Sequence, residues 1–387
     1  MKKKIAILGS TGSIGKSLLD IISKDRNNFD VVLLTANKSS RLLLLQAKKF
    51  KVKNVILTNI NEFNRNKFLF LRNKIRIYNN FKSLNKIFKK KIDYTMSAVI
   101  GLDGLYPTIE IIKFSKTIGI ANKESIICAW DLINKKLKKY KTNFIPIDSE
   151  HFSIWSLIEN YKLQNIKKIH ITASGGPFLR YKLNEFKNIK IQDALKHPNW
   201  KMGKKITIDS STMMNKVFEV IETNRIFNVD LNKIAILIHE KSYLHAIIEF
   251  NDGLIKFLAH DTDMKIPIFN SLYYDVKKNY NGKKINLNYM NNLNLKKIEI
   301  KKFPVVKILK KYPNKNTLFD TVIVSANDTL VKLFLEKKIS FIDISKNLIN
   351  FSKNKEFYKY KKITPKSVDE IYKLSEYVSL KIHSKCI

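Results

Sequence analysis

Apolar and polar residues alternate along the first 150 residues in blocks that predict strands and helices in turn. Residues 4–9 (KIAILG) form a short apolar run, and in residues 14–24 (IGKSLLDIISK) the apolar positions recur at helical spacing. The same two patterns predict strands at 30–36, 54–58, 92–101, 117–122 and 143–150 and helices at 40–50 and 108–116. Strands that alternate with helices favour βαβ units and a parallel sheet. We therefore predict an α/β fold that begins with a parallel-sheet domain over residues 1–147.

The pattern changes near residue 150, where longer apolar segments are typical of antiparallel strands. Such strands are expected within 167–176, 204–211, 233–240 and 243–261. The last segment contains Asn251-Asp252-Gly253 between two apolar runs, which is a strong hairpin signal. We therefore predict a central α+β domain over residues 148–273.

The C-terminal third has two further patterns. Residues 274–303 are rich in lysine and asparagine with little periodicity, so we expect a linker on the surface. Residues 304–387 repeat apolar positions at helical spacing, which predicts a C-terminal helical bundle.

A glycine-rich segment, Gly9-Ser10-Thr11-Gly12-Ser13-Ile14-Gly15, lies between the first predicted strand and the first predicted helix. In that position backbone N–H groups and the helix dipole can hold a pyrophosphate, so we predict a Rossmann-like, dinucleotide-binding N-terminal domain. An NAD site usually has an acidic residue at the end of the second strand, but residues 35–41 read TANKSSR. Cations and neutral donors suit a 2′-phosphate, so the sequence favours NADP over NAD.

Two acidic residues, Asp148 and Glu150, follow an apolar run that we interpret as a strand. Residues two apart on a strand point the same way, so the two carboxylates would repel each other unless a cation lay between them. Oxygen ligands favour Mg²⁺ or Mn²⁺ over zinc. The sequence therefore predicts a divalent-metal site here, although a polar loop end is the simpler explanation of this motif alone.

A third motif spans residues 209–219 (DSSTMMNKVFE), where we expect a strand to end in hydroxyl residues and a helix to begin. Asn215 and Lys216 share a helix face with Glu219, because residues three and four apart are neighbours on a helix. Hydroxyl, amide and ammonium groups are phosphate or sugar ligands, and Glu219 could be a third metal carboxylate. A capped amphipathic helix is the alternative.

Two loops lie between these motifs. Residues 173–178 (ASGGPF) form a Gly-Gly turn with a hydroxyl at Ser174, which suits the close approach of an anion. Residues 197–203 (HPNWKMG) combine His197, a proline and Trp200, and such a segment can close over a substrate.

Charge and cysteine content add two constraints. The formal net charge is +39, but seven of the 72 cations are arginine and 65 are lysine spread along the chain, which favours solvated surface over a nucleic-acid footprint. Cys128 and Cys386 show no disulfide or zinc spacing, which fits a reducing compartment. No apolar run has the length of a signal-peptide core or of a membrane span, so we expect a cytoplasmic protein without a membrane partner.

Taken together, the motifs resemble those of the 1-deoxy-D-xylulose 5-phosphate reductoisomerase family. The resemblance runs in order from residue 5 to about residue 270, and more loosely to the C-terminus, through GSTGSIG, ANKES, PIDSEH, ASGGPF and HPNWKMGKKITIDSSTMMNK. It implies an enzyme that rearranges 1-deoxy-D-xylulose 5-phosphate and reduces it to 2-C-methyl-D-erythritol 4-phosphate in the non-mevalonate isoprenoid pathway. It also implies NADPH and a divalent metal (Mg²⁺ or Mn²⁺, with Co²⁺ as a further candidate) as cofactors, a phosphosugar substrate and a homodimer.

The resemblance also implies roles for individual residues. The catalytic residues would be Lys123, Asp148, Glu150, His197 and Glu219, of which Asp148, Glu150 and Glu219 would bind the metal. The NADPH-binding residues would be Thr11, Gly12, Ser13, Ile14, Asn37, Lys38, Ser39, Asn122, Glu124 and Gly203. The substrate-binding residues would be Lys123, Ser149, Glu150, Ser174, His197, Ser210, Asn215, Lys216 and Glu219, with Trp200 and Met202 on a flexible lid.

The chain departs from the family pattern at several positions. The usual Gly-Lys-Asn after the second strand is Asn37-Lys38-Ser39, the usual Pro-Gln is Glu240-Lys241, and the usual LGxPDM reads AHDTDM at 259–264, with His260 at the glycine. The usual NAANE reads VSAND at 324–328. These departures bear on packing, dimer contacts and cofactor affinity, not on the implied metal or phosphate ligands.

Two other functions compete with the reductoisomerase. One is a different NADP-dependent dehydrogenase, which would need neither three carboxylates nor a phosphate clamp. The other is a basic nucleic-acid-binding protein, which only the net charge supports. It predicts tight, salt-sensitive binding to DNA or RNA.

Overall fold

The computed structural model describes residues 2–159, 161–200, 202–282 and 286–386. The chain forms two compact units, which are described one at a time. The first comprises residues 1–125, 132–148 and 264–281, and the second residues 126–131, 149–263 and 282–387. The domain boundaries expected at 147, 273 and 303 stay predictions.

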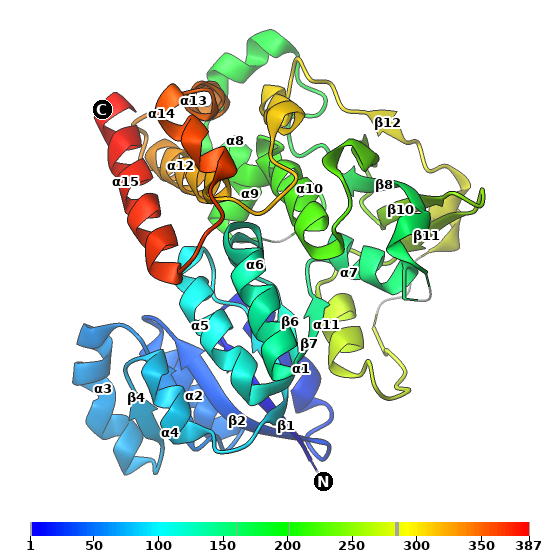
Figure 1. Ribbon diagram of the computed structural model, residues 1–387. Helices are drawn as coiled ribbons and strands as arrows, with labels where there is room; N and C mark the ends of the chain where they lie inside the picture. Colours follow the sequence, from blue (N-terminus) through cyan, green and yellow to red (C-terminus); the bar gives the residue numbers. More distant parts are fainter. Residues whose placement is uncertain (1, 160, 201, 283–285, 387) are drawn as a thin grey trace. The chain divides into compact units, whose positions relative to one another are not determined.

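The first unit is built on a seven-stranded parallel sheet (Figure 1). Its strands lie in the order β4-β3-β2-β1-β5-β6-β7, with the order reversing at β1. The strands are β1 (Lys3–Leu8), β2 (Phe29–Ala36), β3 (Asn54–Leu57), β4 (Arg76–Tyr78), β5 (Ile92–Ser97), β6 (Ser115–Ile120) and β7 (Asn143–Pro146). In open sheets of this kind a ligand binds at the carboxyl ends of the strands where the order reverses, next to the loop after β1.

Helices connect these strands in the alternation that the sequence predicts. They are α1 (Ser13–Ser23), α2 (Ser40–Lys49), α3 (Ile60–Arg72), α4 (Leu84–Ile87), α5 (Leu105–Ile111) and α6 (Lys123–Tyr140). The predicted pattern missed α3, β4, α4 and α6, and the helix expected over 108–116 gives way to β6 at Ser115. A later helix, α11 (Lys265–Leu272), packs on α1, where Lys265 binds Asp20 at 2.6 Å.

The second unit contains a five-stranded mixed sheet in the order β11-β10-β8-β9-β12. Its strands are β8 (Ile166–Ala173), β9 (Ile234–Ile238), β10 (Leu244–Phe250), β11 (Ile255–Ala259) and β12 (Lys296–Lys297). The predicted hairpin at 251–253 is confirmed, because β10 and β11 pair antiparallel across it. The expectation of antiparallel pairing fails for β8 and β9, which run parallel.

Helices make up the rest of the second unit (Figure 1). Of these, α7 (Ser149–Leu157) and α10 (Met214–Phe227) pack on the sheet, α9 (Lys204–Ser211) packs on α10, and α8 (Ile191–Ala194) packs on α9. The C-terminal helices are α12 (Leu318–Leu335), α13 (Phe341–Ser352), α14 (Lys355–Tyr358) and α15 (Val368–Cys386), and α12 packs against both α13 and α15. This confirms the predicted helical bundle. No helix in the described part of the chain could cross a membrane.

Next to the chemistry-bearing motifs, one strand prediction is wrong and another extends too far. Residues 204–211 form α9, although isoleucine and threonine alternate there as they would in a strand. Thr207, Ile208 and Ser211 are buried, and their spacing is that of one helix face, so tertiary packing overrides the local alternation. The strand expected over 143–150 ends at Pro146, and α7 begins at Ser149. Asp148 and Glu150 therefore do not project from one strand.

A buried ion pair holds α10 against α12. Arg225, in the last turn of α10, donates to both carboxylate oxygens of Asp320 at 2.8 and 3.2 Å, and the two side chains are only 2% and 0% exposed. Asn316 and the backbone N–H of Thr317 donate to the same carboxylate, so its charge is well satisfied. Removing one partner of such a pair leaves a buried charge, and that loss is strongly destabilising.

We expect Arg225→Met to lower the free energy of unfolding by about 3–5 kcal/mol, because it leaves the Asp320 carboxylate buried without its cation. Glu336→Gln is the control, since it removes an exposed carboxylate that lies 3.1 Å from Lys338 and 4.0 Å from Lys332, and it should change stability by less than about 0.5 kcal/mol. Urea unfolding followed by circular dichroism measures both. A loss below about 1 kcal/mol for Arg225→Met would show that the pair does not hold α10 in place.

Candidate active site

The glycine-rich loop after β1 is shaped by close backbone contacts. Gly9 has a φ of +83°, and a Cβ there would lie 2.7 Å from the carbonyl oxygen of Ala98. A Cβ on Gly15 would lie 2.5 Å from the carbonyl oxygen of Gly9, so both positions require glycine. Gly12 is the N-cap of α1, and the first turn of that helix contains no acidic residue. The loop therefore presents a helix N-terminus suited to an anionic group.

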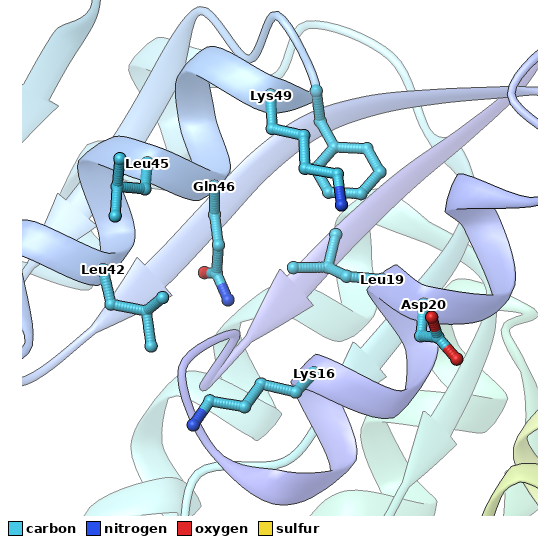
Figure 2. A pocket seen from close by; sticks show the side chains of 8 residues that line it. Lys16, Leu19, Asp20, Leu42, Leu45, Gln46 and Lys49 are labelled. Atoms are coloured by element: carbon cyan, nitrogen blue, oxygen red, sulfur yellow. The ribbon is translucent and has the colours of Figure 1, made fainter.

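Gln46 of α2 fixes this loop from behind. Its amide donates to the carbonyl oxygen of Ser10 at 2.9 Å, and its carbonyl accepts from the Ser10 hydroxyl at 2.8 Å. Gln46 also lines a cavity of about 250 Å³ between α1 and α2, together with Phe50. Figure 2 shows the other residues that line it, which are Lys16, Leu19, Asp20, Leu42, Leu45 and Lys49. This cavity is smaller than typical ligand pockets, which begin at roughly 300 Å³, so we assign no ligand to it.

The other predicted cofactor residues of the first unit also follow strand ends. Asn37, Lys38 and Ser39 are exposed directly after β2. Asn122, after β6, caps α6 by accepting from the backbone N–H of Ser125 and donates to the carbonyl oxygen of Gly101 at 2.7 Å. After β7, Asp148 forms an ion pair with Lys123 at 3.0 Å. All these residues therefore lie at the carboxyl edge of one parallel sheet.

In the second unit, two buried carboxylates share one ammonium group. Lys216 Nζ lies 2.6 Å from Glu150 Oε1 and 2.6 Å from Glu219 Oε2. The Ser149 hydroxyl donates to the other oxygen of Glu150 at 2.6 Å, and the Asn215 amide donates to the other oxygen of Glu219. Carboxylate oxygens of Glu150 and Glu219 lie within 4.8 Å of each other, a spacing that one metal ion can bridge.

The electrostatics of this cluster favour a charged Lys216. Burial by itself lowers the pKa of Lys216, but the charges and hydrogen bonds of Glu150 and Glu219 more than offset burial and raise that pKa above its usual value. The two carboxylates thus share one cation, the ammonium group of Lys216.

A tight connection brings α9 and α10 together at this cluster. Only Thr212 and Met213 separate the two helices, and Met213 has a φ of +66°, in the left-handed region that non-glycine residues rarely adopt. Strain of this kind persists only where surrounding packing fixes the backbone. The connection places Ser210, at the end of α9, close in the chain to Asn215 and Lys216, at the start of α10.

The Gly-Gly turn after β8 packs against the same connection. Gly176 has a φ of +66°, and a Cβ there would lie 3.0 Å from the carbonyl oxygen of Ser210. Ser174 accepts from the backbone N–H of Gly176 at 3.1 Å and lies 3.2 Å from His197 Nε2. Three residues that are far apart in sequence therefore converge beside α10: Ser174, His197 and Ser210.

The hydrogen bonds of His197 define its tautomer. Nδ1 accepts from the backbone N–H groups of Asn199 at 3.2 Å and Trp200 at 2.9 Å, so the proton of a neutral ring sits on Nε2 and can be donated to Ser174. Burial, followed by the positive charge of Lys216, lowers the pKa of His197 to about 4. The ring is therefore a neutral hydrogen-bond donor near pH 7.

A polar network behind α9 was missed by the sequence analysis. The buried side chain of Asn327, on α12, donates to Asp209 Oδ1 at 2.8 Å. Lys205 lies 3.1 Å from Asp209 and 3.0 Å from Asp328. Asp209 precedes Ser210, so this network fixes the end of α9. Asp209 and Asn327 both lie in motifs singled out from the sequence, but nothing local to either motif indicates that they meet.

The predicted lid contributes an aromatic contact. Trp200 lies edge-on to His245, with ring centroids 6.1 Å apart, and His245 stacks on His260 at 3.8 Å. His260, which stands where the family has glycine, thus extends the wall that Trp200 contacts. Met202 is half-buried, and Gly203 is the exposed N-cap of α9.

Comparison with known proteins gives a consistent result along the whole chain. Family models of 1-deoxy-D-xylulose 5-phosphate reductoisomerase match residues 5–130, and models of its C-terminal domains match residues 144–227 and 260–379. The chain is 59% identical to the Pelagibacter ubique 1-deoxy-D-xylulose 5-phosphate reductoisomerase over 387 residues, which cover 100% of both chains. It is 37% identical to the enzyme of that name from a Sulfurihydrogenibium species over 369 residues, 95% of this chain and 94% of the relative.

Solved structures agree with the sequence comparison. The chain is similar to the reductoisomerase from Zymomonas mobilis in complex with NADPH, with a TM-score of 0.89, 29% identity and coverage of 100% and 99% of the two chains. It is also similar to a DOX-P reductoisomerase in complex with NADPH, fosmidomycin and magnesium, with a TM-score of 0.92, 28% identity and coverage of 99% and 98%.

We expect the His197 ring to stay neutral from about pH 8 down to about pH 5.5, because its pKa lies near 4. In the proton NMR spectrum the ring C2–H signal, assigned by its loss in His197→Asn, should not shift over that range. The ordinary pKa of about 6.5 applies to the unfolded chain, so this residue should favour unfolding as pH falls from about 6.5 toward 4. A midpoint near 6.5 in the folded protein would show that burial does not lower the pKa of His197.

Proposed function

The chain belongs to the 1-deoxy-D-xylulose 5-phosphate reductoisomerase family, and on that premise we propose which of its residues form the active site. The enzyme is an NADPH- and divalent-metal-dependent oxidoreductase. It rearranges 1-deoxy-D-xylulose 5-phosphate and reduces the product to 2-C-methyl-D-erythritol 4-phosphate, a step toward isoprenoid precursors. The observation that carries the residue assignment is the cluster of Glu150 and Glu219 around a single cation.

We propose that Asp148, Glu150 and Glu219 hold the divalent metal. Glu150 and Glu219 converge on one ammonium group, which supports a site built for positive charge. Asp148 is two residues from Glu150 in the chain, and an all-oxygen donor set suits Mg²⁺ or Mn²⁺. When bound, such an ion acts as a Lewis acid on the oxygens of the substrate.

The phosphate of the substrate is assigned to the donors beside α10. Ser174, Ser210, Asn215 and Lys216 supply hydroxyl, amide and ammonium groups, and neutral His197 supplies an Nε2–H donor. A phosphate held away from the reacting carbons orients the sugar, which lowers the entropic cost of the reaction. Ser149 and Lys123, each next to a proposed metal ligand, complete the proposed substrate contacts.

NADPH, which supplies the hydride, is assigned to the glycine-rich loop and the neighbouring strand ends. The N-terminus of α1 and the backbone of Thr11, Gly12 and Ser13 suit its pyrophosphate. Asn37, Lys38 and Ser39 are exposed after β2, where a 2′-phosphate would lie. The remaining proposed cofactor residues are Ile14, Asn122, Glu124 and Gly203.

Glu222, one helical turn after Glu219 on α10, pairs with His151 of α7, and both are residue types that bind metals. Glu222 Oε2 is 3.4 Å from His151 Nδ1, and both side chains are buried. His151 also contacts the backbone carbonyl oxygen of Glu219 at 3.0 Å, which favours a role in supporting α10. Glu222 is therefore a matched control for Glu219, because it is a buried carboxylate on the same helix.

We expect Glu219→Gln to reduce metal-dependent oxidation of NADPH by at least about 100-fold, because the variant loses a metal carboxylate but keeps its shape. The assay supplies 1-deoxy-D-xylulose 5-phosphate with Mg²⁺ or Mn²⁺, and a chelator should abolish turnover. Glu222→Gln should retain most of the activity. If Glu222→Gln lost more activity than Glu219→Gln, the metal would be assigned to Glu222 and His151 instead. Metal-independent turnover would favour an ordinary NADP-dependent dehydrogenase.

We also propose a homodimer in the cytoplasm. The edge strand β11 exposes apolar side chains, with Ile255 63% and Phe257 44% exposed on one face. An exposed apolar edge strand is a pairing surface that proteins usually cover, and a second copy of the chain would cover it. Cys128 and Cys386 are free thiols, which supports a reducing compartment.

We expect Phe257→Lys to weaken the dimer by about tenfold or more, because a charge would be buried at the interface. Phe68→Lys is the control, since Phe68 is 72% exposed on α3, in the other unit. Light scattering over a concentration series measures the dissociation constant of both variants. Equal constants for Phe257→Lys and the unchanged protein would exclude β11 from the interface.

A further inference from the structure

Three polar side chains satisfy the carboxylates of Glu150 and Glu219. Lys216 donates to one oxygen of each, at 2.6 Å in both cases. Ser149 donates to the second oxygen of Glu150 at 2.6 Å, and Asn215 donates to the second oxygen of Glu219. Each of the four carboxylate oxygens thus accepts a hydrogen bond from a residue that the proposed function assigns to the substrate.

These contacts set up a competition. A divalent cation binds carboxylate oxygens at about 2.0–2.6 Å, closer than any hydrogen-bond donor, and it repels an ammonium group that shares the same oxygens. Lys216 cannot keep both of its ion pairs when a dication binds Glu150 and Glu219. The ammonium group must then find another anion, since a buried unpaired charge is costly.

The surroundings of Lys216 indicate which anion that is. Lys216 is the third residue of the 14-residue helix α10, where the helix dipole favours an anion over a cation. The positive charge of Lys216 acts on His197, which itself contacts Ser174. The phosphate donors thus lie within electrostatic reach of the ammonium, and the long lysine side chain can turn toward them by rotation about its own bonds.

We propose that binding of the divalent cation releases Lys216, together with Asn215 and Ser149, from the two carboxylates and thereby makes them available to the phosphosugar. This inference rests on the proposed metal and phosphate ligands. Metal and phosphate binding are then positively coupled through the protein, and by thermodynamic linkage each ligand strengthens the other by the same factor. A phosphate compound that arrives before the metal meets donors that are already engaged.

The test measures this coupling by binding and not by turnover. Mn²⁺ affinity of the full-length chain is measured by electron paramagnetic resonance of the free ion, with and without saturating inorganic phosphate. Phosphate affinity is measured by calorimetry, with and without Mg²⁺. In the unchanged protein each ligand should tighten the other by at least about fivefold. In Lys216→Met the coupling should fall below about twofold, while Mn²⁺ alone should bind more tightly than to the unchanged protein, because the competing ammonium is gone.

Ser210→Ala is the matched control. Ser210 is a proposed phosphate ligand on α9 and is not among the donors to Glu150 or Glu219. Its loss should weaken phosphate binding but leave the coupling factor unchanged. Lys216→Gln is a second variant to use if Lys216→Met unfolds, as judged by its thermal transition and by NADPH binding.

Each alternative outcome overturns a distinct statement. Coupling that survives in the Lys216 variants would show that Mn²⁺ and phosphate attract each other directly, and the inference would fall while the proposed ligands stand. Weaker Mn²⁺ binding in those variants would likewise exclude competition. If the unchanged protein bound neither Mn²⁺ nor phosphate, the proposed ligand assignment itself would fall, and the inference with it.

Discussion

The second unit depends on one electrostatic constraint, the need to neutralise the buried carboxylates of Glu150 and Glu219. They approach closely enough to share the ammonium of Lys216, and without a cation such a pair would repel and take up protons. The constraint fixes the start of α7, which carries Glu150, against the first turns of α10. Lys216 supplies that positive charge from the first turn of α10.

The rest of the second unit holds these charges in place. Asp320 pairs with Arg225 at the far end of α10, and Asn327 binds Asp209 at the end of α9, so α12 anchors both helices. Between α9 and α10, Met213 has a left-handed backbone conformation, which persists only where the surrounding packing fixes it. The C-terminal helices thus position α9 and α10, which explains why helices that carry no proposed ligand belong to the same compact unit as Glu150 and Glu219.

The sequence predicts the first unit better than the second. In the segment from β1 to α2, apolar runs, glycines and helical spacing all indicate the same structure, and those elements agree with the prediction. In residues 204–211, by contrast, alternating isoleucine and threonine indicate a strand, while burial of Thr207, Ile208 and Ser211 requires a helix. The argument that placed Asp148 and Glu150 on one strand is wrong as well, because β7 ends two residues before Asp148.

The metal site at Asp148 and Glu150 stays a prediction, and its physical argument does not depend on the strand. Closely spaced acidic residues need a cation in any backbone conformation, and the structure supplies one for Glu150 from Lys216. Sequence patterns could not reveal that contact, because the two residues lie 66 positions apart and meet only through the packing of α7 on α10. Chemistry that follows from residue type can therefore be predicted from sequence, whereas the partner that satisfies each charge depends on the fold.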